Sequence, residues 1–314
     1  MKIAFERNVI VPVLALERYR DQIKLDQPYD PPSGGIAKEE ERVDIVNRLL
    51  DVLVNVERLS VVHKIPEDYK SKRELLRALL NVRLPDPMNK AFLESVNRLL
   101  WDETLKKEIV DCTLFQPVSA SFNTAELKNG NRLFLWKGDI TSLWADAVVN
   151  AANDRMLGCF KPMHNCIDNV IHSAAGPLLR QDCKIITDIS GSPEKTGDSK
   201  ITRAYNLPSK YVLHTVGPVI HSEDVTEEQR NQLASCYRSC LSLAAQIKNI
   251  RSIAFPCIST GVFNFPREQA SQIAVKTVDD WLGSNSHHFS HVIFNVFLKE
   301  DLEVYARLFR GSGS

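Results

Sequence analysis

The chain has 314 residues, of which 44% are hydrophobic and 25% are charged, with 13 glycines and 15 prolines. This composition is typical of a globular protein of one to three domains and excludes disordered, collagen-like and coiled-coil chains. The 39 basic and 39 acidic residues give zero formal net charge. No general attraction to nucleic acid or to an anionic membrane is therefore expected.

The sequence also predicts neither a membrane-spanning nor a secreted protein. Its apolar start is interrupted by Glu6 and Arg7, and no later stretch approaches the roughly 20 uncharged residues of a membrane span. We therefore expect a cytoplasmic protein. Its seven cysteines then argue against a disulfide framework, which leaves core packing, a thiol nucleophile or a metal site. The last four residues, 311–314 (GSGS), are expected to be a cloning tail.

The first part of the chain has the apolar spacing of helices. Apolar residues recur at helical intervals over 37–60, and the pattern repeats over 73–80 and 89–105. Residues 27–35 form an irregular stretch rich in proline and glycine. We predict a helical N-terminal domain over residues 1–125, in which no chemistry stands out.

After Gly130 the hydrophobic period changes to that of strands alternating with helices. Such alternation implies an α/β fold with a largely parallel sheet covered by helices. In such sheets ligands bind at the carboxyl ends of the strands. The predicted strands are 132–136, 147–149, 211–215, 252–255 and 291–297, and the predicted helices are 167–180, 227–247 and 267–282.

Three segments that follow predicted strands carry unusual polar residues. They are 137–141 (KGDIT), 150–153 (NAAN) and 257–266 (CISTGVFNFP). Each segment taken alone is also compatible with an ordinary turn. Their chemistry suits a nucleotide, because a carboxylate accepts from an exocyclic amine and an amide side chain both donates and accepts. A Ser-Thr-Gly turn that enters a helix offers backbone N–H donors to a diphosphate.

Taken together, the motifs GDIT, DAVVNAAN, TGDSKIT, YVLHTVGP and PCISTGVFNFP resemble the macrodomain family, whose members bind ADP-ribose. The resemblance implies a three-layer α/β/α sandwich with a mixed sheet, which we place at residues 126–310. By motif position, Asp139 would accept from the adenine amino group beside the backbone of Ile140. Asn153 would hold the distal ribose. The pyrophosphate loop would consist of Ser259, Thr260, Gly261, Val262 and Phe263, the last of which could equally be a core aromatic.

The segment after the Asn-rich strand departs from the glycine-rich loop of most macrodomains. It contains Cys159, His164 and Cys166 in the spacing C-x4-H-x-C. Two thiolates and an imidazole suit zinc, and three protein ligands leave a coordination position open, as in catalytic sites. We therefore expect one Zn²⁺ per chain. The alternatives are three unrelated core residues, or a closed structural site in which Cys183 is the fourth ligand.

The segment 156–176 also resembles the zinc-dependent macrodomains, microbial protein-ADP-ribose hydrolases with a helical N-terminal extension, and the MacroD-type hydrolases. The resemblance implies a zinc-dependent hydrolase that removes mono-ADP-ribose from protein side chains at C1″ of the distal ribose. Asp168 and Asn153 would be its catalytic residues. The alternatives are a non-catalytic reader of ADP-ribosylated protein, an O-acetyl-ADP-ribose deacetylase, or a thiol hydrolase with Cys159 or Cys257 as its nucleophile.

The expected roles within this site follow from charge. Two thiolates weaken zinc as a Lewis acid, so we expect the ion mainly to position the ribose. Asp168 begins a predicted helix, whose N-terminus should lower the carboxyl pKa, and it should therefore orient water rather than act as a strong base. His172 is expected to be a core residue. The expected partners of the chain, which we take to be a monomer, are ADP-ribose and mono-ADP-ribosylated protein. The N-terminal domain would either dock that protein or cover one face of the sheet.

Overall fold

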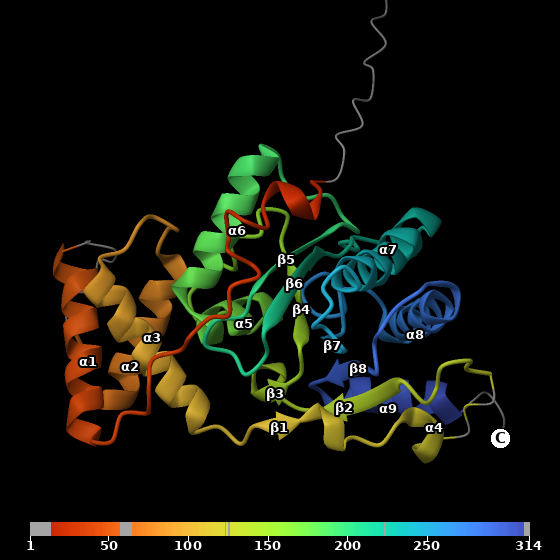
Figure 1. Cartoon of the computed structure of the whole chain (residues 1–314), viewed down its shortest axis with the longest axis horizontal. Coiled ribbons are helices and arrows are strands. Elements are labelled where there is room, and N and C mark those ends of the chain that lie inside the picture. The colour runs from red at the N-terminus through yellow and green to blue at the C-terminus, as the bar shows by residue number, and fades with distance from the viewer. Residues whose placement is uncertain (1–13, 57–64, 123, 125, 223, 311–314) are drawn as a thin grey trace, which may run out of the picture.

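The computed structural model describes residues 14–56, 65–122, 124, 126–222 and 224–310, and a six-stranded sheet lies at its centre (Figure 1). The tail at 311–314, the apolar start of the chain and the end of the first predicted helix lie outside the described residues. The strand order is β2-β8-β7-β4-β6-β5, and only β5 runs antiparallel to its neighbour. The strands are β2 (Leu133–Lys137), β4 (Ala147–Ala152), β5 (Ser199–Arg203), β6 (Tyr211–Val216), β7 (Ser252–Phe255) and β8 (His291–Val296).

Helices cover both faces of this sheet because successive side chains of each strand point to opposite sides. Val148 and Val212 pack toward one face, whereas their neighbours Ala147 and Leu213 belong to the core of the other. The sheet is mixed and lies between helical layers, which confirms the predicted three-layer sandwich. The first face is covered by α5 (Ile167–Ala175) and α6 (Pro177–Ser190), and the second by α7 (Glu227–Ala244), α8 (Arg267–Ser284) and α9 (Lys299–Arg310).

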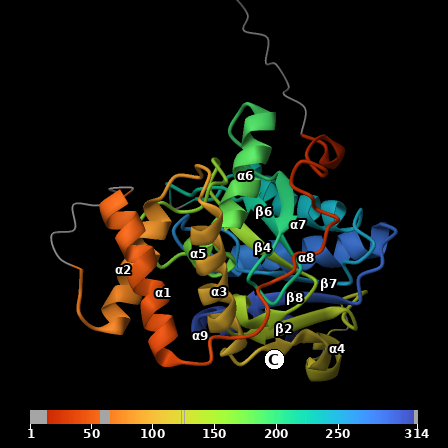
Figure 2. The ribbon, with the colours of Figure 1, turned by 60° about the vertical axis from the view of Figure 1, so that its left-hand side comes forward.

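The N-terminal helices form a further layer outside α5, as Figures 1 and 2 both show. They have a hydrophobic cluster of their own, which includes Leu49, Leu76 and Leu99. None of the helices described is both long and apolar enough to cross a membrane. The domain boundary after residue 125 stays a prediction. The elements of this part are α1 (Glu39–Asp51), a π-helical turn at Val52–Val56, α2 (Tyr69–Val82), α3 (Lys90–Leu105), β1 (Val110–Asp111), which pairs with β3 (Leu143–Trp144), and α4 (Val118–Ser121).

The segment before these helices packs against the sheet instead. Tyr19 is fully buried, and its hydroxyl accepts a hydrogen bond of 3.2 Å from the backbone N–H of Ile201 on the edge strand β5. Leu16, Ile23 and Leu25 belong to the same core as α7 and α8. Residues 16–25 therefore cover the outer edge of β5.

The predicted helix over 167–180 is two helices in the structure. Gly176 ends α5 with φ +92°, a conformation that residues with a Cβ disfavour, and Pro177 begins α6. The prediction was wrong here because the apolar period continues across the break.

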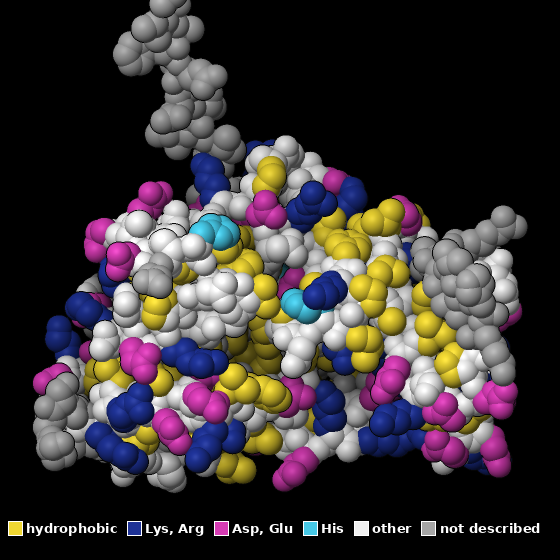
Figure 3. Space-filling view, turned by 180° about the vertical axis from the view of Figure 1, so that it is seen from behind, with side chains coloured by type: hydrophobic (Ala, Val, Ile, Leu, Met, Phe, Trp, Pro, Cys, Tyr) yellow, Lys and Arg dark blue, Asp and Glu magenta, His cyan; other side chains and the backbone are white. Residues whose placement is uncertain are grey.

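The surface agrees with the zero net charge. Figure 3 shows basic and acidic side chains interspersed over the face it presents.

Candidate active site

A cleft of about 520 Å³ opens at the carboxyl ends of the central strands. It is lined by the residues that follow β4, β7 and β8 and by the start of α5. This is the edge of the sheet at which the topology predicts a ligand. The structure brings most of the predicted site residues together here: Asn153, Cys159, His164, Cys166, Asp168, Ser259, Thr260, Gly261, Val262 and Phe263.

Two predicted binding residues lie outside the lining of this cleft. Asp139 follows β2, and its Oδ1 accepts hydrogen bonds from the backbone N–H and hydroxyl of Thr141. Its Oδ2 lies 3.5 Å from Lys107 Nζ, and its side chain is 45% exposed. The side chain of Ile140 is buried in the core beneath α5. Asp139 nevertheless lies close to the cleft, because Asn295, which lines it, donates to the carbonyl of Gly138.

The loop after β7 has free donors that suit a diphosphate. No hydrogen bond in the described part of the chain uses the backbone N–H groups of Gly261, Val262 and Phe263. Ser259 has φ +64°, and its buried Oγ has no partner among the described residues. A buried polar atom without a partner is costly, so a ligand oxygen at this loop would satisfy groups that the protein leaves open.

Asp168 is a buried carboxylate at the floor of the cleft. Only 5% of it is exposed. Its Oδ1 accepts from Asn150 Nδ2 at 2.8 Å, and its Oδ2 accepts from Asn153 Nδ2 at 3.3 Å. Burial raises its pKa to about 6, against the hydrogen bond from Asn150 and the charge of Arg180. The expectation that the helix N-terminus lowers this pKa was wrong, because the cost of burying the charge exceeds the effect of the helix dipole.

His172 lies behind Asp168 in the core, as expected. Its Nε2 is 3.5 Å from Asp168 Oδ1, and burial lowers its pKa well below the usual value, so the ring is neutral. Gly158 lies against this ring with φ +81°, and a Cβ there would come within 2.8 Å of it. The carbonyl of Gly158 accepts from Asn153 Nδ2 at 3.1 Å. Asn153 thus ties the Cys159 segment to Asp168.

The side chains of Cys159, His164 and Cys166 come together just before the N-terminus of α5. Their ligand atoms lie within 4.8 Å of one another, and Cys159 Sγ is 3.4 Å from His164 Nδ1. Burial raises the pKa of Cys166 to about 12, so a neighbouring cation is needed to hold it as a thiolate at neutral pH. Two sulfurs and one imidazole on a half-buried loop are a donor set that zinc prefers. The residues therefore fit the ion that the sequence suggests.

Cys183 lies in a separate, buried group with His172 and His214. Asn150 Nδ2 faces His214 Nδ1 at 3.2 Å, which places the ring proton on Nε2, where Thr202 Oγ1 accepts it at 3.0 Å. His214 therefore has no lone pair for a metal. Cys183 therefore does not belong to the group of Cys159, His164 and Cys166. No fourth Cys, His, Asp or Glu among the described residues lies within 4.8 Å of all three ligand atoms of that group.

The buried His214 should make folding sensitive to acid. Burial lowers its pKa to about 3, whereas the unfolded chain has the ordinary value near 6.5. Stability from the neutral ring is complete above pH 6.5 and is lost as the pH falls toward 3. We expect wild type to lose about 1.4 kcal/mol per pH unit below 6.5 relative to His214→Gln. Urea unfolding of both chains at pH 7 and pH 5 measures this difference, and equal pH dependence would contradict it.

The cleft also contains residues that sequence reasoning missed. Phe297, 66% exposed, and Leu298 follow β8 at the cleft rim, and Arg267 pairs with Asp301 at 2.8 Å. The rule that ligands bind after strands could have found the first two, but the predicted strand ended one residue late. The thiol of Cys257 also lines the cleft, and burial raises its pKa, which argues against a thiolate nucleophile there.

The comparisons with known proteins agree with this geometry. A model of the Macro domain family matches residues 149–274. A protein-ADP-ribose hydrolase of Treponema medium is 42% identical over 87% of this chain and 99% of its own length. One of Staphylococcus aureus is 43% identical over 78% of this chain and 87% of its own length.

The solved structures that are similar to the chain include two macrodomains with bound nucleotides. The macrodomain of Oceanobacillus iheyensis with ADP has a TM-score of 0.50 and 34% identity, covering 58% of this chain and 90% of that one. The macrodomain of Trypanosoma brucei in complex with ADP-ribose has a TM-score of 0.53 and 28% identity, covering 77% of this chain and 95% of that one. With 42% identity over nearly the whole length of a curated relative, the chain belongs to the macrodomain family.

Proposed function

We propose that this protein is a zinc-dependent hydrolase that removes mono-ADP-ribose from modified protein side chains. The observation that carries the proposal is the placement of three features in one cleft: the open N–H groups of the loop after β7, the buried carboxylate of Asp168, and the Cys–His–Cys group. The names of the relatives support ADP-ribose removal, and the solved relatives with ADP and ADP-ribose support the ligand.

ADP-ribose would lie along the strand ends. The backbone N–H groups of residues 261–263 and the Ser259 hydroxyl would donate to the pyrophosphate, and Phe297 offers an exposed ring to the adenine. The distal ribose would then point toward Asn153 and Asp168, which line the other end of the cleft.

Hydrolysis requires a water directed at C1″ of the distal ribose. Asp168 would accept a hydrogen bond from that water and take its proton as the water oxygen bonds to C1″ and the bond from C1″ to the protein side chain breaks. Asp168 would then return the proton to the departing side chain. Asn150 and Asn153 hold the carboxylate in place for both transfers. Cys159, His164 and Cys166 would hold the zinc ion, which when bound would offer an open coordination position to a ribose hydroxyl oxygen. Asn153 Oδ1 accepts from the backbone N–H of Arg155 at 3.0 Å, and its second lone pair would be available to a ribose hydroxyl.

The test is release of ADP-ribose from modified proteins with serine, arginine or acidic linkages, measured on zinc-loaded and chelated protein. Release by the zinc-loaded form alone supports the hydrolase. Binding of ADP-ribosylated protein without release would favour a reader, and release of acetate from O-acetyl-ADP-ribose alone would favour a deacetylase.

A contact of Asp139 with adenine predicts a moderate loss of affinity. Asp139→Ala should weaken ADP-ribose binding by about 1 kcal/mol. The effect should be moderate because the Asp139 side chain is half-exposed and its Oδ2, the oxygen that would accept from the amine, also pairs with Lys107. Asp139→Asn should weaken it as much, since it keeps the oxygen that accepts from Thr141 but puts a donor where the amine would approach. Isothermal titration measures both, and unchanged affinity in both variants would mean that another group reads the adenine.

A further inference from the structure

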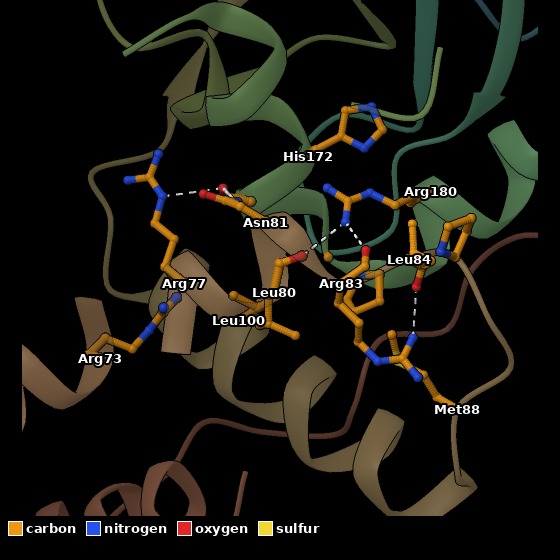
Figure 4. Close-up of a pocket in the computed structure, with 14 residues that line it drawn as sticks. Arg73, Arg77, Leu80, Asn81, Arg83, Leu84, Met88, Leu100, His172 and Arg180 are labelled. Atoms are coloured by element: carbon orange, nitrogen blue, oxygen red, sulfur yellow. Dashed lines mark hydrogen bonds between the residues drawn. The ribbon is translucent and has the colours of Figure 1, made fainter. Parts of the chain in front are cut away.

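Helix α2 of the N-terminal part reaches the metal loop, residues 159–166, through one amide side chain. Asn81 lies in the last turn of α2 and is 2% exposed. Its Oδ1 accepts from the backbone N–H of Met163 at 3.1 Å and from Asn169 Nδ2 at 3.0 Å. Its Nδ2 donates to Ser173 Oγ at 3.0 Å. Figure 4 shows Asn81 pointing away from α2 and toward α5, so its polar contacts are made to the metal loop and α5.

The bond to Met163 fixes an unfavourable part of the metal loop. Met163 has φ +54°, a left-handed conformation that a residue with a Cβ adopts only when its surroundings hold it there. It directly precedes His164, so its backbone angles set the direction of the imidazole. Asn81 is the hydrogen-bond acceptor of this backbone N–H.

The bond to Asn169 fixes the other end of the loop. Asn169 is fully buried; its Nδ2 also donates to the carbonyl of Lys161 at 3.1 Å, and its backbone N–H donates to Cys166 Sγ at 3.4 Å. Arg77 of α2 donates to Asn169 Oδ1 at 2.9 Å. Asn81 and Asn169 therefore hold Lys161, Met163 and Cys166 at fixed separations.

We infer that Asn81 is a positioning residue for the metal group, so that the N-terminal helical part is built into the metal site. The inference rests on the proposed function, which supplies zinc as the ion. Mutation of a side chain that orients a metal ligand without touching the metal commonly weakens metal affinity about 10- to 100-fold.

The test compares Asn81→Ala with a matched control, Asn97→Ala. Asn97 is also a buried amide of the N-terminal helices, 6% exposed, but its Oδ1 accepts from Asn206 Nδ2, outside the metal loop. Zinc affinity is measured by competition with a chromophoric chelator, and ADP affinity and apo-protein melting report on folding. We expect N81A to bind zinc at least about tenfold more weakly and N97A within about threefold of wild type.

Two further variants sharpen the result. Asn81→Asp keeps the acceptor oxygen and should restore zinc affinity to within about threefold of wild type. Asn81→Leu fills the same space without an acceptor, and it replaces N81A if that chain does not fold. Wild-type zinc affinity in N81A or N81L, or equal weakening in N97A, would overturn the inference while leaving the proposed function intact. A wild-type chain that binds no zinc overturns both.

Discussion

Replacing Asp168 with alanine should lower single-turnover hydrolysis by about 10²- to 10⁴-fold and leave the affinity for free ADP-ribose nearly unchanged. The reason is that a carboxylate that orients and deprotonates water acts mainly in the transition state. Asp168 is buried at the cleft floor, and amide donors from Asn150 and Asn153 fix its oxygens. Rapid quench on mono-ADP-ribosylated protein, beside calorimetry with ADP-ribose, separates the two quantities.

The chain provides a matched control for this variant. Asp182 is also buried, and burial raises its pKa to about 6, but it lies on α6, outside the lining of the cleft, and accepts from the hydroxyl of Tyr205. Asp182→Asn should therefore keep near wild-type turnover. If Asp168→Ala keeps it as well, the carboxylate is not the catalytic group, and water activation must be assigned to the metal.

Cys159→Ala should remove zinc and hydrolysis together while the domain still folds. Cys159 lies half-buried on a loop, and the core of the sandwich does not include it. Loss of one of three ligands should weaken zinc binding far more than a change beyond the ligands, hence by well over about 100-fold. We also expect weaker ADP-ribose binding, since the distal ribose loses its positioning. Elemental analysis and single-turnover assays on the same preparation measure these effects.

Cys257→Ala is the control for this prediction. Cys257 lines the same cleft but does not belong to the group of Cys159, His164 and Cys166. It should keep about one zinc per chain and full turnover. Loss of turnover in Cys257→Ala with zinc retained would instead support a thiol hydrolase, and a wild-type protein free of zinc would refute the metal site.

The parallel core of the fold could be predicted from sequence because its strands are apolar on both faces. The strand 252–255 was predicted with the bounds that β7 has. The edge strand β5 was missed because its buried Lys200 and Thr202 give no hydrophobic period. The buried Lys200 forms an ion pair with Glu194 at 2.5 Å, and only the tertiary structure supplies this partner.

The candidate site could be predicted to a similar extent and for a similar reason. Motifs directly after strands led to Asn153, Ser259 and the Cys–His–Cys spacing, since topology alone brings such residues to one edge. Asn150 was missed as a site residue, although it donates to both Asp168 and His214. The role of Asn150 depends on which side chains pack against this fully buried residue of β4. The raised pKa of Asp168 likewise depends on its burial among side chains that only the tertiary structure brings together.

The contact between Tyr19 and Ile201 has a consequence for the separated macrodomain. A strand at the edge of a sheet exposes unpaired N–H and C=O groups, which readily recruit a strand from another molecule. The hydroxyl of Tyr19 accepts a hydrogen bond from one such N–H group on β5, and residues 16–25 lie over the same edge. A chain cut at residue 126 would expose this edge and become prone to self-association. Residues 16–25 thus protect the edge of the sheet from pairing with a strand of another molecule.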